Sequence, residues 1–280
     1  MRAAAIQLNS TGDKARNVET AERLVRAAAA GGAELVVLPE KWNLLGDSAT
    51  LRAGAEPLDG PTISGARSWA RELGIHLVAG SIAERSDYQE KSFNTSTLIG
   101  PDGELEAAYR KIHMFDVDVG GVAYRESEHE EPGEEIVTAG LGGALEGVTL
   151  GMSVCYDLRF PELYRILAVR GARVITVPSA FTLETGKDHW DVLLRARAIE
   201  NQAFVVAPNQ IGEAPPHYRS YGRSAILDPW GVILAQAPDE ECFVAADLDL
   251  ELQERVRATL PSLANRRPAS YEWPEEVHVR

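Results

Sequence analysis

Cys155, Glu40 and Lys111 carry side chains that together could attack a carbonyl or nitrile carbon, and each stands at the end of a predicted element. Cys155 stops an apolar run, Glu40 follows the apolar segment 34–38, and Lys111 follows the segment 104–110. A carboxylate can take the thiol proton, a thiolate can attack a carbonyl or nitrile carbon, and an ammonium can stabilise the negative charge that develops. The three residue types therefore indicate a hydrolase with a cysteine nucleophile.

Each of the three residues also has an ordinary structural interpretation. A lone cysteine in an apolar run is usually a small buried hydrophobe, so for Cys155 by itself the two interpretations carry equal weight. A lysine such as Lys111 ordinarily keeps a solvated head on an apolar stem; as a functional group it would stabilise an oxyanion and help to hold a nearby thiol ionised. For Glu40 the ordinary interpretation is a solvated loop carboxylate. Its place directly after a continuous apolar strand modestly favours function, because functional groups gather beyond the carboxyl ends of strands in α/β sheets.

The residues around Cys155 predict a sharp turn from a strand into a helix. The strand begins near Gly147, and apolar residues then recur at helical spacing until Gly171. Asp157 can cap that helix and Pro161 suits its first turn. In such a position, the backbone N–H groups that open the helix could stabilise both a thiolate and an oxyanion.

The rest of the chain alternates between strand and helix patterns, with hairpins interleaved and no break that resembles a linker. We therefore expect α/β architecture, with one domain of two packed sheets flanked by helices. From about residue 250 the chain has no clear periodicity, and we expect a C-terminal arm that lies over a partner subunit. The predicted strands cover 2–9, 34–38, 75–82, 93–99, 104–110, 173–177, 203–207, 222–227, 232–237 and 242–246.

The predicted helices leave three long loops between elements, at 41–60, 113–133 and 208–221. Helices are expected at 13–30 and 61–73, and a third runs to Asn201 from a cap at Thr185 or Asp188. The third helix is expected to turn four apolar side chains inward: Val192, Leu193, Ala196 and Ile199. Cys242 lies in a predicted strand and is interpreted as a core residue.

The loop 113–133 and the residues just after it carry a run of acids. Taken alone, these acids are expected to form a mostly solvated surface. Long loops inside a compact domain are nevertheless often functional. The acids are Glu126, Glu128, Glu130, Glu131, Glu134 and Glu135.

Composition excludes several classes of protein. Of the 280 residues, 28 are Lys or Arg and 42 are Asp or Glu, so the formal charge is −14, which disfavours nucleic acids and anionic membranes as partners. A small anionic substrate is not excluded, since a few arginines can dominate one pocket. Two cysteines provide no disulfide framework and fit a reducing compartment, so we expect a cytoplasmic protein. Met1 is not followed by a signal-peptide pattern, and no apolar run is long enough to span a membrane.

Three sequence blocks carry a resemblance to a known family. Leu-Pro-Glu at 38–40, Tyr-Arg-Lys-Ile-His at 109–113 and Cys-Tyr-Asp-Leu-Arg-Phe-Pro-Glu at 155–162 resemble the signature blocks of the nitrilase superfamily of carbon–nitrogen hydrolases. Cys-Tyr-Asp followed by Arg-Phe-Pro-Glu is similar to the Nit branch, which includes ω-amidase and deaminated glutathione amidase. The resemblance runs nearly end to end, with further blocks at 189–190, 194–201, 220–224, 228–231 and 266–268.

The resemblance implies a fold, an assembly and residue roles. It implies a four-layer αββα sandwich, no metal or organic cofactor, and a homodimer or larger homo-oligomer. It assigns Cys155 as nucleophile, Glu40 as general base and Lys111 as oxyanion stabiliser, which is the Glu-Lys-Cys triad. Tyr156 would contribute its backbone N–H to the oxyanion hole, and Glu126 would position the lysine and the substrate. The chain departs from its relatives at positions 120–121, where Gly-Gly stands in place of the frequent Pro-Gly. This difference puts the rigidity of the loop, and so the placement of Glu126, in question.

The resemblance also suggests a substrate class, which is a small amide that bears a carboxylate. The stretch 155–273 looks closer to deaminated glutathione amidase than to ω-amidase, whose substrate is 2-oxoglutaramate. Deaminated glutathione and 2-oxoglutaramate share a 2-oxoglutarate acyl part. Other small amides or carbamoyl compounds remain alternative substrates. Arg159 or Arg219 could bind the carboxylate, or form a structural ion pair. Phe181 could line the pocket or simply pack. Arg197 and Glu200, three residues apart on a helix, are expected to pair locally.

Rival chemistries lack their own patterns in this chain. The histidines show no zinc-ligand spacing, no cysteine stands in a papain-like Cys-Gly-Ser-Cys setting, and no Cys-x-x-Cys motif exists. A catalytically silent scaffold remains as the alternative to an enzyme. Such a scaffold is expected to lack part of the triad, whereas all three residues are present. Much faster alkylation of Cys155 than of Cys242 would also argue against a scaffold.

Overall fold

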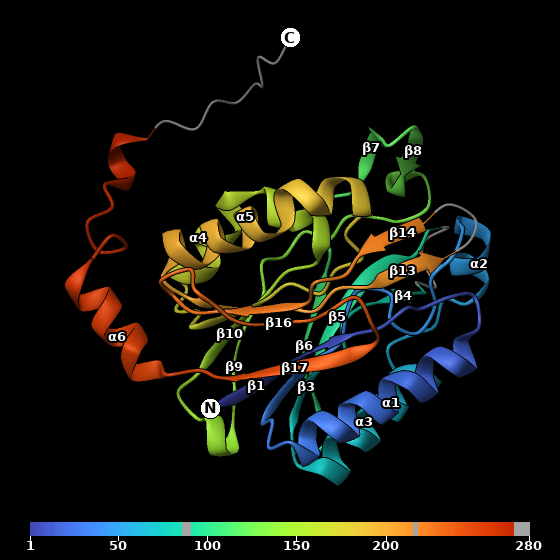
Figure 1. Cartoon of the computed structure of the whole chain (residues 1–280), viewed down its shortest axis with the longest axis horizontal. Helices are drawn as coiled ribbons and strands as arrows, with labels where there is room; N and C mark the ends of the chain where they lie inside the picture. Colours follow the sequence, from blue (N-terminus) through green and yellow to red (C-terminus); the bar gives the residue numbers. More distant parts are fainter. Residues whose placement is uncertain (86–90, 215–217, 272–280) are drawn as a thin grey trace.

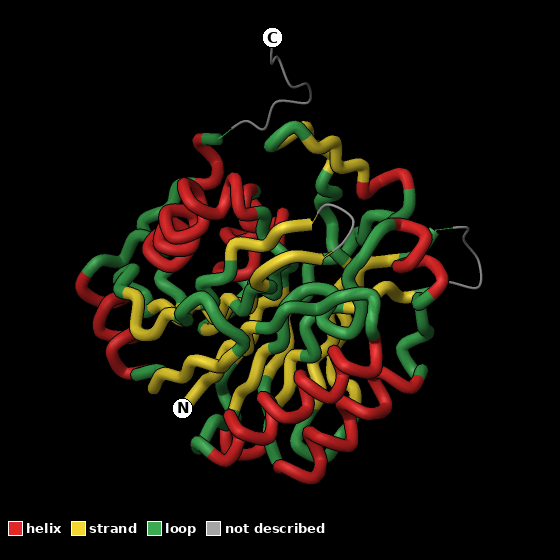
Figure 2. Tube along the Cα trace, turned by 45° about the vertical axis from the view of Figure 1, so that its right-hand side comes forward, coloured by secondary structure: helices red, strands yellow, loops and turns green. Residues whose placement is uncertain are grey.

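The computed structural model describes residues 1–85, 91–214 and 218–271, which form four layers (Figure 1). Two β-sheets lie face to face, and each is covered on its outer side by a pair of helices. Figure 2 shows the same order from a second direction, with strands between two outer sets of helices. This arrangement confirms the expected four-layer αββα sandwich.

The first sheet has seven strands in the order β17-β1-β2-β3-β5-β4, with β6 paired to β5. β1, β2 and β3 run parallel, so their carboxyl ends lie on one edge. The break between β3 and β4 contains Gly80, at φ +47°, where a Cβ would overlap the carbonyl oxygen of Pro39. The strands are β1 (Arg2–Gln7), β2 (Leu35–Val37), β3 (His76–Val78), β4 (Ile82–Glu84), β5 (Phe93–Ile99), β6 (Leu105–Arg110) and β17 (Cys242–Asp247).

The second sheet has six strands in the order β16-β15-β12-β11-β10-β9. Its central strands β10, β11 and β12 are also parallel. Each sheet therefore presents the carboxyl ends of three parallel strands, and these ends carry the chemistry described below. The strands are β9 (Thr138–Gly140), β10 (Thr149–Met152), β11 (Val174–Thr176), β12 (Phe204–Ala207), β15 (Ala225–Leu227) and β16 (Ile233–Gln236).

Alternation along the strands divides the apolar residues between two cores. On β1, Ala4 and Ile6 pack against α1 (Lys14–Ala30) and α3 (Pro61–Leu73), whereas Ala3 and Ala5 face the second sheet. The second sheet is covered by α4 (Pro161–Val169) and α5 (Leu183–Asn201). The predicted ends of α1 and α3 are confirmed, since Asp13 caps the first and Gly74 ends the second in a left-handed conformation.

The three predicted loops contain short elements that were not expected. The loop 113–133 contains a β-hairpin, and its two turn residues Gly120 and Gly121 have φ +61° and +77°, the signs that a type I′ turn requires. These elements are too short for a period to be read from sequence. They are α2 (Ser48–Ala53), β7 (Asp116–Val119), β8 (Val122–Arg125), β13 (Ile211–Ala214) and β14 (Tyr218–Tyr221), with the 3₁₀ turn η1 (Glu126–Glu128) after β8. Outside these loops, a 3₁₀ turn η2 (Gly143–Leu145) lies between β9 and β10.

The prediction for α5 was wrong in two respects. The helix begins at Leu183 after the cap residue Thr182, earlier than expected. Val192 and Ile199, expected to point inward, are 65% and 50% exposed. The buried face carries Trp190, Leu194 and Ala198, together with the polar residues Arg197 and Asn201, whose polar groups find partners inside the protein. An apolar stripe therefore faces outward on this side of the molecule.

The C-terminal part is more regular than expected. A helix, α6 (Leu250–Thr259), and a 3₁₀ turn, η4 (Pro268–Ser270), follow β17, whereas residues 272–280 lie outside the described part. Cys242 is the first residue of β17 and only partly buried, so its assignment to the core was wrong. That the arm packs against a partner subunit remains a prediction.

Candidate active site

Cys155 lies on a tight turn between β10 and α4, with φ +47°, a conformation that costs free energy in a residue with a Cβ. A short 3₁₀ turn, η3 (Cys155–Arg159), follows, and α4 itself begins only at Pro161, so Asp157 does not cap that helix. The Cys155 N–H donates to the carbonyl of Pro178, 2.9 Å away. The next amide, Tyr156 N–H, has no backbone acceptor in the described residues, which is the state expected of an oxyanion-hole donor.

Asp157 fixes this turn to the end of β6 instead. Its fully buried carboxylate accepts hydrogen bonds from the Tyr109 hydroxyl at 2.6 Å, from the Val154 N–H at 2.8 Å and from the His113 ring at 2.7 Å. Tyr109 and His113 flank Lys111 on the chain. One buried carboxylate therefore holds the lysine and the cysteine in a fixed relation across the two sheets.

The Glu40 carboxylate lies at the centre of the site and is 3% exposed. One oxygen, Oε1, accepts from the Asn94 amide at 2.8 Å and from Lys111 Nζ at 3.1 Å. The other, Oε2, accepts from the Ala180 N–H at 2.8 Å. The Cys155 thiol lines the same pocket, near enough for the charge of this carboxylate to raise the pKa of the thiol. Glu40 is therefore oriented by three donors and placed to receive the thiol proton.

Glu126 is the second carboxylate that binds the Lys111 ammonium, in addition to Glu40. Its two oxygens lie 2.9 and 2.7 Å from Nζ, and the Phe115 N–H holds one of them at 2.8 Å. Burial would lower the pKa of Lys111, but the carboxylates of Glu126 and Glu40 outweigh that effect and hold this pKa well above its ordinary value. The pKa of Glu126 is correspondingly held far below its ordinary range, mainly by Lys111 against the opposing effect of burial. Both groups are therefore charged at neutral pH.

The expectation that Lys111 holds the thiol of Cys155 ionised was wrong. Burial, and then the neighbouring charge of Glu40, raise the pKa of the thiol well above its ordinary value, and the attraction of Lys111 does not compensate. The resting nucleophile is therefore a neutral thiol in the same pocket as the Glu40 carboxylate. Its proton can therefore move to Glu40 as the sulfur attacks, which is general-base catalysis.

A pocket beside the thiol contains most of the remaining predicted residues. Phe181 and Tyr156 line it, and Phe181 also packs on the Trp190 ring. Arg159 lies over the Phe181 ring at 5.2 Å, lines the same pocket, and forms no ion pair with a carboxylate in the described residues. Arg219 lies elsewhere, exposed and 3.8 Å from Glu213. Of the two arginines considered for a substrate carboxylate, only Arg159 reaches the pocket.

Other predictions about charged groups had mixed outcomes. The local pair of Arg197 and Glu200 is confirmed at 2.8 Å. The expectation of a solvated acidic run was wrong for Glu126 and Glu130, because both pair with lysines, Glu130 buried and Glu126 with its side chain 10% exposed.

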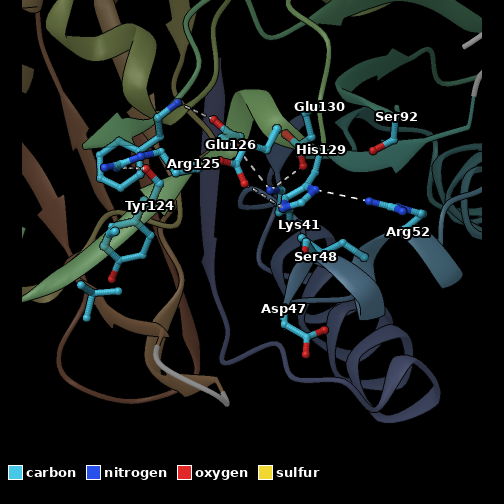
Figure 3. A pocket seen from close by; sticks show the side chains of 16 residues that line it. Lys41, Asp47, Ser48, Arg52, Ser92, Tyr124, Arg125, Glu126, His129 and Glu130 are labelled. Atoms are coloured by element: carbon cyan, nitrogen blue, oxygen red, sulfur yellow. Dashed lines mark hydrogen bonds and ion pairs between the residues drawn. The ribbon is translucent and has the colours of Figure 1, made fainter. Parts of the chain in front are cut away.

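Several residues that shape the site were missed by the sequence analysis. Asn94 and the Ala180 N–H orient Glu40, while Lys41 and Glu130 form a buried pair behind Glu126. Of these residues, only Lys41 and Glu130 could have been noticed in the sequence. Lys41 directly follows Glu40, and Glu130 is an acid four residues after Glu126. Figure 3 shows the two side chains pointing toward each other and toward Glu126.

The described residues contain no group of three or more His, Cys, Asp or Glu side chains placed to hold a metal ion. Among the helices described, none combines the length and the apolar character that crossing a membrane would require.

Comparison with known proteins gives consistent matches over nearly the whole chain. The family model "Carbon-nitrogen hydrolase" matches residues 2–258. A deaminated glutathione amidase from Synechocystis sp. is 40% identical over 266 residues, which cover 94% of this chain and 97% of the relative. The omega-amidase NIT2 of Homo sapiens is 37% identical over 271 residues, with 96% of each chain covered.

Solved structures agree with these matches. Nit3 of Saccharomyces cerevisiae, a member of branch 10 of the nitrilase superfamily, superimposes with a TM-score of 0.86 at 32% identity and 97% coverage of each chain. An amidase from Nesterenkonia sp. AN1, 28% identical with a TM-score of 0.77, covers 93% of this chain and 98% of its own. In that structure, acrylamide has added to the active site cysteine.

Proposed function

Because the chain belongs to the carbon–nitrogen hydrolase family and is a cysteine-dependent amidase, we propose that Cys155 is its nucleophile and that its substrate is a small amide with a carboxylate on the acyl part. One observation carries this proposal. The Glu40 carboxylate accepts a hydrogen bond from the Lys111 ammonium and lines the same buried pocket as the Cys155 thiol. A base, a nucleophile and a fixed cation are thus within reach of one carbonyl group.

The first half of the reaction forms a thioester. The Cys155 sulfur attacks the amide carbonyl carbon while its proton passes to Glu40. The carbonyl oxygen becomes an oxyanion, which Lys111 and the Tyr156 N–H stabilise. The carbonyl re-forms, the C–N bond breaks, and Glu40 returns the proton to the leaving nitrogen, so ammonia or an amine departs.

The second half regenerates the enzyme. Glu40 takes a proton from a water molecule as that water attacks the thioester carbonyl carbon. The same two donors stabilise the second oxyanion, and the C–S bond breaks to release the carboxylic acid. The proton returns to the sulfur of Cys155. Glu126 takes no part in bond making; its role is to hold the Lys111 ammonium at a fixed position.

We assign Arg159 as the partner of the substrate carboxylate. Its guanidinium lines the pocket with Phe181 and can make a bidentate contact with a carboxylate. An acyl part that ends in a carboxylate is common to deaminated glutathione and 2-oxoglutaramate. Among these, deaminated glutathione is the preferred proposal, supported by the 40% identity to an amidase of that name. 2-Oxoglutaramate is the second candidate, supported by the 37% identity to an omega-amidase.

Release of 2-oxoglutarate from each of the two amides tests the substrate directly. We expect kcat/KM for deaminated glutathione to exceed that for 2-oxoglutaramate by at least about tenfold, a difference of about 1.4 kcal/mol in transition-state binding. The reverse preference would identify the second candidate. Hydrolysis of neither amide would overturn both, and a panel of other small amides and carbamoyl compounds would follow.

We further propose that the chain forms a homodimer or larger homo-oligomer through α4 and α5. These helices pack together and lie on one face of the molecule (Figure 1). Their outward sides expose Ile166 and Val169 on α4 and Val192 and Ile199 on α5, an apolar patch of the kind that marks an interface. The C-terminal arm, from about residue 250, is proposed to extend over the partner.

Replacing Val192 by glutamate is expected to break this assembly. An uncompensated charge in the interface would raise the dissociation constant at least about 100-fold, or about 3 kcal/mol. Light scattering after size exclusion would then give a monomer of 30.5 kDa for the variant and a multiple of that mass for the native chain. Leu105→Glu, at an exposed apolar side chain of β6, is the control that should leave the mass unchanged. A native chain that elutes as a monomer would refute the proposed interface.

The compartment is proposed to be the cytoplasm. Both cysteines are free, and the mechanism needs Cys155 as a thiol. A reducing compartment preserves that state.

A further inference from the structure

A second buried ion pair lies directly behind Glu126, on the side away from Cys155. Lys41 follows Glu40 on the chain with φ +51°, and its side chain is 5% exposed. Its Nζ lies 2.7 Å from Glu130 Oε1 and 3.4 Å from Glu126 Oε1 (Figure 3). The ammonium of Lys41 is thus shared between two carboxylates, of which one also holds the catalytic lysine.

Glu130 is an unusual carboxylate because only one of its oxygens has a partner. The residue is 3% exposed, and its Oε2 is buried without a hydrogen bond in the described residues. A buried, half-paired carboxylate is unfavourable when ionised. Burial raises the pKa of Glu130 to about 7, against the opposing attraction of Lys41. Its charge therefore changes near neutral pH.

A cavity of about 300 Å³ gives Glu130 a route for proton exchange. The cavity is lined by Lys41, Glu126 and Glu130 on its inner side, and by Arg52 and His129 farther out. In Figure 3 the Arg52 guanidinium points at the His129 ring, and the two lie 3.3 Å apart.

Several charged groups surround Glu130. Lys41 and Lys111 attract its carboxylate, Glu126 repels it, and Arg52 and His129 line the same cavity. Glu131, the next residue along the chain, pairs with Lys91.

We propose that Glu130 and Lys41 are positioning residues that control how strongly the Lys111 ammonium stabilises the oxyanion. They act through Lys41, which contacts both Glu130 and Glu126. The inference rests on the proposed roles of Lys111 and Glu126. When Glu130 is protonated, it no longer attracts the Lys41 ammonium as a charge, so Lys41 acts more strongly on Glu126 and two cations share that carboxylate. Less of the Lys111 charge is then neutralised, and more of it stabilises the oxyanion.

Ionisation of Glu130 has the opposite effect. Lys41 is drawn toward Glu130, Glu126 depends more on Lys111, and the cluster gains a negative charge. The charges of Glu40, Lys111, Glu126 and Lys41 sum to zero, so the cluster is neutral below the Glu130 pKa and −1 above it. An oxyanion forms less readily beside a net negative charge. The rate therefore falls as pH rises through the Glu130 pKa.

The ratio of kcat/KM for Glu130→Gln to that of the native enzyme, measured from pH 6 to pH 8, tests this inference. Glutamine keeps the shape of the side chain and fixes the neutral state. The ratio is expected to rise from about one at pH 6 to about three to ten at pH 8, the effect of one partly screened charge. Glu128→Gln is the matched control, because Glu128 lies in the same segment and lines the same cavity, but its side chain is 64% exposed. The ratio of kcat/KM for this variant to that of the native enzyme should stay near one from pH 6 to pH 8.

The double variant Lys41→Met, Glu130→Gln fixes the other charge state. Its cluster carries −1 at every pH, so its kcat/KM should lie about three- to tenfold below that of Glu130→Gln at both ends of the range. A purely structural pair would instead lower activity by the same factor at all pH values. A flat ratio for Glu130→Gln, or an equal rise for Glu128→Gln, overturns the inference. Activity that survives in Cys155→Ala would overturn the proposed function instead, so the two failures are distinguishable.

Discussion

Replacing Cys155 by alanine is expected to lower amide hydrolysis at least about 10⁴-fold, the loss typical of removing a covalent nucleophile. Without the sulfur no thioester can form, and Glu40 has no nucleophile in reach except water. Steady-state release of 2-oxoglutarate measures the loss. Mass spectrometry of the native chain, quenched during turnover, should show a thioester adduct that the variant lacks.

Cys242→Ala is the matched control for this experiment. Cys242 is the other free cysteine and lies at the start of β17, outside the catalytic pocket. Its removal should leave kcat/KM within about twofold of the native value. If Cys155→Ala kept more than a hundredth of the native rate, the proposed nucleophile would be wrong.

Lys111→Met is expected to remove both activity and stability. The variant loses a cation at the developing oxyanion, which is worth at least about 10²- to 10³-fold in kcat. It also leaves Glu40 and Glu126 as two buried carboxylates that face each other without their shared cation. Breaking a buried ion pair by removing one partner costs about 3–5 kcal/mol of unfolding free energy. Urea unfolding and turnover assays measure the two losses separately.

The pH dependence of the stability loss provides a sharper check. In the native chain the pKa of Glu126 is lowered, so this group contributes stability above its unfolded pKa of about 4.3 and loses that contribution as pH falls. In Lys111→Met the carboxylates can protonate, so the difference between variant and native chain should shrink toward pH 4. Lys187→Met, an exposed lysine on α5, should change neither property. An equal loss at pH 4 and pH 8 would contradict the account.

The sequence predicted the layers and the three central residues because both depend on local patterns. Apolar runs mark the buried strands, and Glu40, Lys111 and Cys155 each directly follow such a run. The contacts that tune these residues depend on sheet register and on packing between sheets. Asn94 points to Glu40 because β5 pairs with β4 and β6 in one register, and no period along the chain encodes that.

The wrong predictions share a physical cause, which is burial by distant parts of the chain. Glu130 looks like a solvated acid until Lys41, 89 residues earlier, is placed against it. The thiol of Cys155 looks activated by a lysine until its burial beside Glu40 is known. Val192 and Ile199 on α5 look like core until the packing shows that another face of the helix, which includes the polar Arg197 and Asn201, turns inward. Sequence patterns indicate which residues prefer to be buried, whereas the packing of the whole chain determines which residues are buried.

The division of the catalytic groups between two sheets has a consequence for how the protein folds. Glu40 and Lys111 follow strands of the first sheet, whereas Cys155 and the Ala180 amide follow strands of the second. Contacts over such long sequence separations form late, since loop closure must precede them. Either sheet alone would be inert, and a refolding chain would regain its helical signal before its activity. The nucleophile therefore acquires its base only when the two halves of the protein dock.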